Sequence, residues 1–161
     1  MSGEELIDAA RALEKKLLNF FWRQGVSMGE GEDLVQETYL RLWKYRDRYE
    51  PTAGIATFVF MVARQVRIDA LRRQTRREKR EETWQKERPE VQEPDSWTAE
   101  YVRWAVAQLP EQMREVVEFG VFQDLPYEEV GKILDIPVGT VKSRMFNAIR
   151  KLKELTDDKR S

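Results

Sequence analysis

Apolar residues recur every three or four positions along most of this chain, the spacing of a buried helical face, and no segment shows the alternation of a strand. The pattern is clearest from Leu125 to Lys153, where it predicts two short helices joined by a tight turn at Asp135-Ile136-Pro137. Pro126 suits the first position of the earlier helix, because a proline needs no N–H partner there. Pro137 ends that helix, because it disfavours a helical residue before it and lacks a donor. The predicted inward stripes are Val130, Ile133 and Leu134, and then Val141, Met145, Ile149 and Leu152.

The same spacing predicts more helices upstream, separated by loops rich in Gly and Pro. We expect helices over residues 4–24, 34–49, 55–74, 97–109 and 111–122, with loops at 25–31 and 50–54. Asp33 or Glu32 would open the second helix, and Asp95 or Ser96 would cap the fourth. Within the second helix, the residues spaced for burial are Leu34, Tyr39, Leu42 and Trp43.

Residues 77–95 are highly charged and contain few apolar side chains, so we interpret them as a linker that is helical at its start and disordered later. Trp84 is an unusual residue for such a segment, and it could dock on a neighbouring surface or a partner. The prediction is an all-α protein with two small helical domains, residues 1–76 and 96–161, joined by a flexible linker at 77–95.

Composition removes several kinds of chemistry. The chain has no cysteine and no histidine, which excludes disulfides, thiolate metal sites and the commonest general base. An enzyme would have to rely on Asp, Glu, Lys or Tyr, and no carboxylate cluster is convincing as a metal site. The N-terminus is charged and amphipathic, unlike a signal peptide, and no apolar run approaches the ~18 residues of a membrane span. We therefore expect a cytoplasmic protein with no membrane insertion of its own.

The net charge of −1 conceals a strongly segregated distribution. Residues 1–63 sum to −2, 64–80 to +6, 81–135 to −9 and 136–161 to +4. Two basic segments separated by an acidic one are the pattern expected of a protein that contacts a polyanion at two places.

The later basic segment coincides with the last predicted helix, whose outer face carries Lys142, Ser143, Arg144, Asn147 and Arg150. One interpretation is an ordinary helical hairpin with a solvated basic face. The other is a helix-turn-helix, which places such a helix in the DNA major groove. The absence of acidic residues from Gly139 to Lys153, and the small Gly131 where two helices could cross closely, favour the second.

Two other surfaces have open interpretations. Tyr49, Phe58 and Phe60 lie near the earlier basic segment, where aromatic rings could stack on the bases of single-stranded nucleic acid. A place in the core is favoured for Phe60, and for Phe58 both roles stand. In the second helix, Asp33, Gln36 and Glu37 lie near one face with Leu40 beside them. This patch could bind a partner helix, although a solvated face is the simpler interpretation when the patch is taken alone.

Three blocks of sequence, in order, resemble the small extracytoplasmic-function (ECF, group IV) sigma factors of the bacterial sigma-70 family. Asp33–Trp43 is similar to the family's polymerase-binding helix, and Phe58–Arg73 to its promoter-melting and −10-reading helix. Leu125–Arg150, with Pro137-Val138-Gly139-Thr140-Val141-Lys142-Ser143-Arg144, is similar to its −35-reading helix-turn-helix. Apart from the linker, the resemblance covers about residues 5–153.

The resemblance implies regions 2 and 4 joined by a flexible linker, no cofactor and no catalysis. It implies binding to bacterial core RNA polymerase and promoter DNA, melting of that DNA, and inhibition by an anti-sigma factor. The surfaces around Trp84 and Trp97 are candidates for the inhibitor contact. The implied polymerase-binding residues are Asp33, Gln36, Glu37 and Leu40. The implied −10 residues are Tyr49, Thr57, Phe58, Arg64, Gln65, Arg72 and Arg73, with 49–57 as the loop that holds a flipped base. The implied −35 residues are Thr140, Lys142, Ser143, Arg144, Phe146, Asn147 and Arg150.

Four positions depart from what many family members carry. Phe58 replaces Trp, Met61 replaces Arg, Gln65 replaces Asn, and Asn147 replaces a basic residue. These departures affect the promoter sequence rather than the activity class, and we hypothesise that Asn147 reads adenine, the base its amide geometry favours. The competing class is a stand-alone helix-turn-helix regulator, which leaves residues 33–43 and 58–73 without a role. It would also need a dimer interface, and no apolar seam is spare.

Overall fold

The structure is a computed structural model that describes residues 2–49, 53–80, 91, 93–94 and 98–160, without the side chains of 78–80 and 158–160. Every regular element in these ranges is helical, which confirms the predicted all-α class. The chain forms two compact units, residues 1–22 with 26–87 and residues 23–25 with 88–161. No helix within the described ranges is long and apolar enough to cross a membrane.

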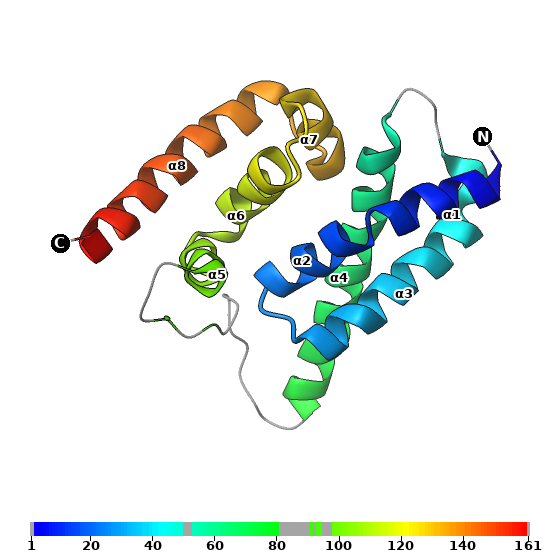
Figure 1. The fold of residues 1–161 in the computed structure, drawn as a ribbon, viewed down its shortest axis with the longest axis horizontal. Coiled ribbons are helices and arrows are strands. Elements are labelled where there is room, and N and C mark those ends of the chain that lie inside the picture. Colours follow the sequence, from blue (N-terminus) through cyan, green and yellow to red (C-terminus); the bar gives the residue numbers. More distant parts are fainter. Residues whose placement is uncertain (1, 50–52, 81–90, 92, 95–97, 161) are drawn as a thin grey trace. The chain divides into compact units, whose positions relative to one another are not determined.

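The described part of the first unit contains four helices and a short 3₁₀ turn (Figure 1). These are α1 (Gly3–Ala12), α2 (Glu14–Arg23), α3 (Met28–Lys44), η1 (Arg46–Arg48) and α4 (Ile55–Arg80). Helices α1 and α3 pack against each other, and both contact α4. The core between them includes Phe20, whose ring meets Phe21 and Phe60 edge-on, at centroid distances of 5.0 and 5.7 Å. Phe60 is buried, as predicted.

The second unit contains α5 (Ala99–Ala107), α6 (Glu111–Val117), the π-helical turn η2 (Glu118–Phe122), α7 (Tyr127–Leu134) and α8 (Val138–Arg160). Helix α8 packs along α6 and α7 and also contacts α5. Its buried stripe is Val141, Met145 and Ala148. Ile149, which was predicted to be buried, is 41% exposed. The buried position is Ala148, which lies seven residues after Val141 and therefore on the same face of the helix. Thr98, not Asp95 or Ser96, caps α5, and its Oγ1 accepts a hydrogen bond of 3.2 Å from the Tyr101 N–H.

Several predicted boundaries in the first unit are wrong. The second predicted helix ends at Lys44 and not at residue 49, and two further differences lie before Asp33. The single helix over 4–24 is two helices, because the chain breaks at Leu13, whose backbone departs from helical values. The loop expected at 29–31 belongs to α3, which Ser27 caps by accepting a hydrogen bond of 3.2 Å from the Glu30 N–H. Gly31 is buried within α3, and a Cβ there would meet Phe21 at 3.8 Å, an ordinary van der Waals distance.

Candidate nucleic-acid interface

The four residues predicted to bind a partner lie on one face of α3. Asp33, Gln36 and Leu40 are exposed and Glu37 is half-buried, while Val35, Thr38 and Leu42 turn inward. Leu40 is 66% exposed, an unusual position for a large apolar side chain unless something covers it. The face therefore combines acceptor groups with one apolar contact, as the sequence predicted, although its role stays a prediction.

Trp43 extends this face, which the sequence analysis missed by assigning it to the core. Its side chain is 47% exposed and lines a shallow groove of about 450 Å³ between α1 and α3, together with Gln36, Tyr39 and Leu40. Burial raises the pKa of Tyr39, with a smaller effect from the charge of Glu14. The helical period contained the signal, because Trp43 lies three residues after Leu40 and seven after Gln36, on the same exposed side.

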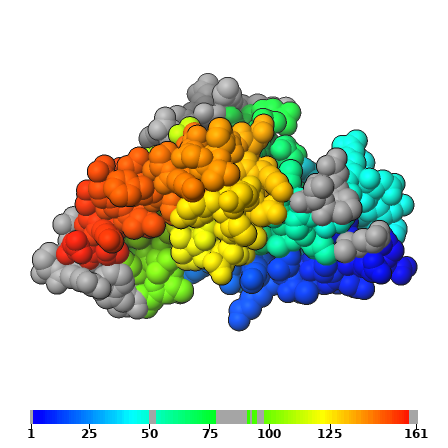
Figure 2. Space-filling view, turned by 90° about the horizontal axis from the view of Figure 1, so that it is seen from above, coloured from blue at the N-terminus to red at the C-terminus, as the bar shows by residue number. Residues whose placement is uncertain are grey.

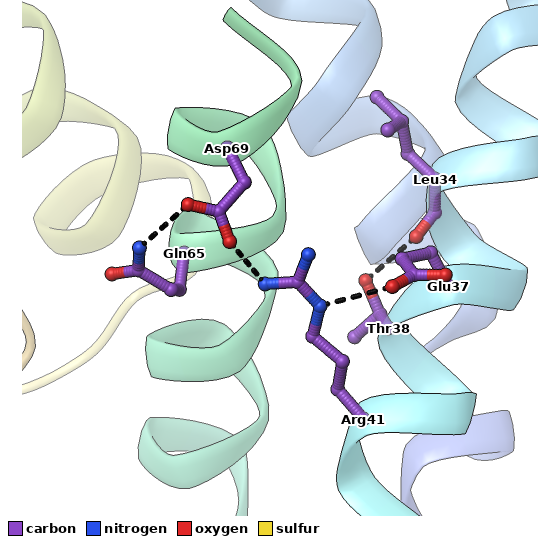
Figure 3. Close-up of polar contacts among 6 residues, drawn as sticks. All are labelled: Leu34, Glu37, Thr38, Arg41, Gln65 and Asp69. Carbon is purple, nitrogen blue, oxygen red and sulfur yellow. Dashed lines mark hydrogen bonds and ion pairs between the residues drawn. The ribbon is translucent and has the colours of Figure 1, made fainter. Parts of the chain in front are cut away.

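A chain of polar contacts links α3 to α4 (Figure 3). Arg41 Nε donates to Glu37 Oε1 at 3.0 Å, and Arg41 Nη1 donates to Asp69 Oδ2 at 2.5 Å. Asp69 Oδ1 accepts a second hydrogen bond, of 3.0 Å, from Gln65 Nε2. The hydrogen bond from Arg41 lowers the pKa of Asp69, so the carboxylate stays ionised well below neutral pH. Sequence reasoning identified Glu37 and Gln65 but neither Arg41 nor Asp69, because the pairing partner lies 28 positions away.

An aromatic pair at the start of α4, Tyr49 ahead of the helix and Phe58 in its first turn, is held in place rather than free. The rings of Tyr49 and Phe58 meet edge-on at 5.3 Å, and the Tyr49 hydroxyl donates to the Ala53 carbonyl at 3.1 Å. Both side chains are half-buried. Their packing can support the loop that, by the family resemblance, holds a flipped base. Thr57 is only 1% exposed, so in this conformation it contributes to the start of α4 and not to the surface. The rest of that loop, residues 50–52, lies outside the described ranges.

The outer surface of α4 carries the remaining predicted −10 residues. Gln65, Arg72 and Arg73 are exposed and Arg64 is half-buried. Met61 is 40% exposed one turn before Gln65, so the two side chains share a face. This segment places cationic and amide groups at the surface of one continuous helix, which extends past the predicted end at residue 74 to Arg80.

The predicted helix-turn-helix is present in α7 and α8. Asp135 ends α7 in a left-handed conformation with φ of 55°, and the Ile136 N–H donates to the Gly131 carbonyl at 3.0 Å. A Cβ on Gly131 would lie 2.8 Å from the Ile136 carbonyl oxygen, so the tight turn requires a glycine. Pro137 precedes α8, and its carbonyl accepts from the Thr140 and Val141 N–H groups at 3.0 and 3.1 Å. The small residue singled out by the sequence lies against the turn, and a Cβ there would also meet Val141 of α8 at 3.8 Å, where the two helices approach each other.

The outer face of α8 gathers all the predicted −35 residues. Lys142, Ser143, Phe146 and Arg150 are exposed, and Thr140, Arg144 and Asn147 are half-buried. Phe146 is 67% exposed, and the Arg150 guanidinium lies 6.0 Å from its ring centroid. In the space-filling view, the gold atoms of α7 and the orange atoms of α8 lie side by side on one surface (Figure 2). A helix that turns basic, amide and apolar groups outward together has the chemistry needed to contact phosphates and base edges.

Two helical units, the second with a basic helix-turn-helix, define a nucleic-acid-binding protein of two domains. Residues 9–77 match the family Sigma-70 region 2, and residues 105–154 match Sigma-70, region 4. The ECF RNA polymerase sigma factor SigL of Mycobacterium tuberculosis is 33% identical over 164 aligned positions, which cover 95% of this chain and 93% of the relative. The ECF RNA polymerase sigma factor RpoE of Cereibacter sphaeroides is 30% identical over 144 residues, covering 86% of this chain and 79% of the relative. The chain belongs to the ECF sigma factors of the sigma-70 family.

Two solved structures share this fold. One is the sigma factor RpoE in complex with the anti-sigma factor NepR from Bartonella quintana, with a TM-score of 0.75, 22% identity and coverage of 96% of this chain and 95% of that chain. The other is CnrH in complex with the cytosolic domain of CnrY, with a TM-score of 0.72, 18% identity and coverage of 98% and 90%.

Proposed function

We propose that this ECF sigma factor binds bacterial core RNA polymerase through α3, anchors on the −35 element through α8 and opens the −10 element with α4 and the loop before it. The observation that carries the proposal is the exposed face of α3, where Leu40 is 66% exposed beside Asp33 and Gln36. A stand-alone DNA-binding regulator has no use for this surface, whereas a factor that must dock on a polymerase needs one.

We propose the residue roles that the family resemblance implies, and the exposed surfaces described above support them. Asp33, Gln36, Glu37 and Leu40 dock on the polymerase. Gln65, Arg72 and Arg73 meet the −10 element, with Arg64 beside them, and Tyr49, Thr57 and Phe58 support the base-holding loop. Flipping a base out of the duplex costs a few kcal/mol, which a pocket and stacking of ~1–3 kcal/mol per base can offset. On α8, Lys142, Arg144 and Arg150 fix the register on phosphates, while Ser143, Phe146 and Asn147 face base edges.

We further propose residues 1–76 and 96–161 as the two functional domains, with 77–95 between them. The factor works in the cytoplasm without catalysis, and an anti-sigma factor holds it inactive. A sigma factor of the same fold was crystallised in complex with an anti-sigma factor, which supports this partner. Trp84 and Trp97, candidates for the inhibitor contact, lie outside the described residues.

The test compares two polymerase preparations on a library of promoters. Core RNA polymerase plus this protein should start transcription at specific sites that core alone ignores. A regulator would act only on a holoenzyme that already carries another sigma factor, and that result would overturn the proposal. Leu40→Asp should abolish the effect with core, and Val121→Asp, a charge placed on a 51% exposed residue of η2, is the matched control.

A further inference from the structure

Asp69 determines which end of the Gln65 amide faces outward. Gln65 Nε2 lies 3.0 Å from Asp69 Oδ1. An ionised carboxylate accepts hydrogen bonds and cannot donate them, so the amide must turn its NH₂ end toward Asp69. The carbonyl oxygen of Gln65 then points away from the carboxylate (Figure 3), and no residue in the described ranges donates to it. Gln65 therefore presents a hydrogen-bond acceptor at the surface of α4, with at most one further N–H.

Arg41 in turn fixes the orientation of Asp69. The Arg41 guanidinium donates to Asp69 Oδ2, and the Gln65 amide donates to Asp69 Oδ1. The carboxylate therefore cannot rotate without losing one of these hydrogen bonds. Arg41 is itself anchored by Glu37 at 3.0 Å on its own helix. The acceptor at Gln65 is thus set by groups on two helices, and it does not depend on an exposed side chain finding one rotamer by chance.

The neighbouring position strengthens this arrangement. Met61 lies one turn before Gln65 and is 40% exposed, and its thioether is at most a weak acceptor. On this face, Met61 offers no strong donor or acceptor that would compete with Gln65 for a base. The two departures from the common family pattern, at positions 61 and 65, therefore have one combined effect: Gln65 supplies the hydrogen-bond acceptor on this face, and Met61 does not compete with it.

We propose that Gln65, oriented by Asp69, selects a base whose major-groove edge carries an exocyclic amino group, adenine or cytosine, at one position of the −10 region. Adenine N6 and cytosine N4 donate to an outward carbonyl, whereas guanine O6 and thymine O4 are acceptors and are rejected. Gln65 is the specificity-determining residue and Asp69 a positioning residue. The inference rests on the proposed function, because it needs α4 to meet promoter DNA.

The test uses core polymerase with the full-length protein on a library randomised across the −10 region, and it sequences the promoters that initiate. The wild type should prefer adenine or cytosine about fivefold over guanine or thymine at one position. Gln65→Ala should remove that preference and leave the others. Asp69→Asn keeps an oxygen for Arg41 and turns an NH₂ toward Gln65, which flips the Gln65 amide. Its preference at the same position should therefore change to guanine or thymine, an inversion that mere loss of stability does not produce.

Gln112→Ala removes an exposed amide from α6 and is the matched control, with an unchanged profile expected. The inference is overturned if Gln65→Ala has the same promoter profile as the wild type. It is also overturned if the preference that Gln65→Ala loses is one for guanine or thymine. If Asp69→Asn initiates with the wild-type preference, Asp69 does not position the amide. If Asp69→Asn fails to fold, Gln65→Ala decides, because it leaves the Arg41–Asp69 pair intact. Absence of initiation by the wild type with core would instead overturn the proposed function.

Discussion

Arg41 on α3 and Asp69 on α4 form an ion pair of 2.5 Å that joins the helix proposed to dock on polymerase to the helix proposed to open DNA. The pair continues to Glu37 on one side and Gln65 on the other. Both surfaces of the first unit are thus attached to the same partly buried carboxylate and guanidinium, whose side chains are 29% and 18% exposed. A substitution at this pair should therefore change both the free energy of unfolding and the promoter preference.

The contribution of the pair to stability can be isolated by a double-mutant cycle of Arg41→Ala and Asp69→Ala. We expect a coupling energy of about 1 kcal/mol in urea unfolding, since partial exposure leaves the pair screened by solvent. The Lys132–Glu129 pair is the control, because it is longer, at 3.6 Å, and its Lys132 side chain is 48% exposed; it should give a coupling near zero. Equal couplings for the two pairs would show that the Arg41–Asp69 geometry adds nothing.

The same pair predicts a dependence of stability on pH. Arg41 lowers the pKa of Asp69 below its ordinary value of 3.8 in the folded state. The resulting stabilisation is present above that value and is lost as the pH falls through the lower, folded-state pKa. The stability difference between the wild type and Asp69→Asn should therefore be constant between pH 5 and 7 and shrink in more acidic solution. A difference that grows on acidification would contradict the assignment.

Gly131 is predicted to be irreplaceable for steric reasons. Gly131→Ala brings a Cβ to 2.8 Å from the Ile136 carbonyl oxygen, and backbone cannot yield as cheaply as a side chain. The unfolding free energy of the protein should fall by about 1–3 kcal/mol. Gly139→Ala is the matched control in the next helix, because its Cβ meets nothing within 4 Å. Similar losses from both substitutions would mean that helix propensity, and not the turn, is responsible.

Substitutions of Lys142 and Asn147 on α8 should have different effects on promoter binding. Lys142→Ala should remove the phosphate contact proposed for this residue, and so weaken binding of all promoters alike and reduce the salt dependence by about one ion. Asn147→Ala should relax the choice of adenine at one −35 position by about 1–3 kcal/mol and leave the others unchanged. Selection of promoters by each variant holoenzyme, at two salt concentrations, measures both effects. An unaltered sequence profile in Asn147→Ala would refute the role of Asn147.

Sequence reasoning succeeded where local patterns decide the structure. The helix-turn-helix follows from Pro126, Pro137 and the apolar spacing around them, and the structure confirms the turn at Asp135. Most of the polar and apolar positions of α3 and α8 follow from the helical period, with Trp43 and Ile149 as the exceptions. These features depend on contacts within a few residues, which a single sequence displays directly.

The errors arose where tertiary packing overrides local preference. The glycines before Asp33 suggested a loop, yet Gly31 packs against Phe21 inside α3. Trp43 was assigned to the core by its size, although its position on the helix leaves it 47% exposed. The Arg41–Asp69 pair was missed because no local spacing connects two residues on different helices. The errors at Gly31 and at the ion pair could be resolved only by knowing which helix faces which, whereas the exposed position of Trp43 could have been inferred from the helical period alone.

The central claim, that this factor opens promoter DNA only as part of a polymerase, is tested most directly by strand opening. Promoter DNA with 2-aminopurine in the −10 element should gain fluorescence when core polymerase and this protein are both present. The protein alone or core alone should leave the signal unchanged, and Leu40→Asp should abolish the gain. Full opening or tight, specific duplex binding by the free protein would contradict the account, as would a closed promoter in the presence of both components.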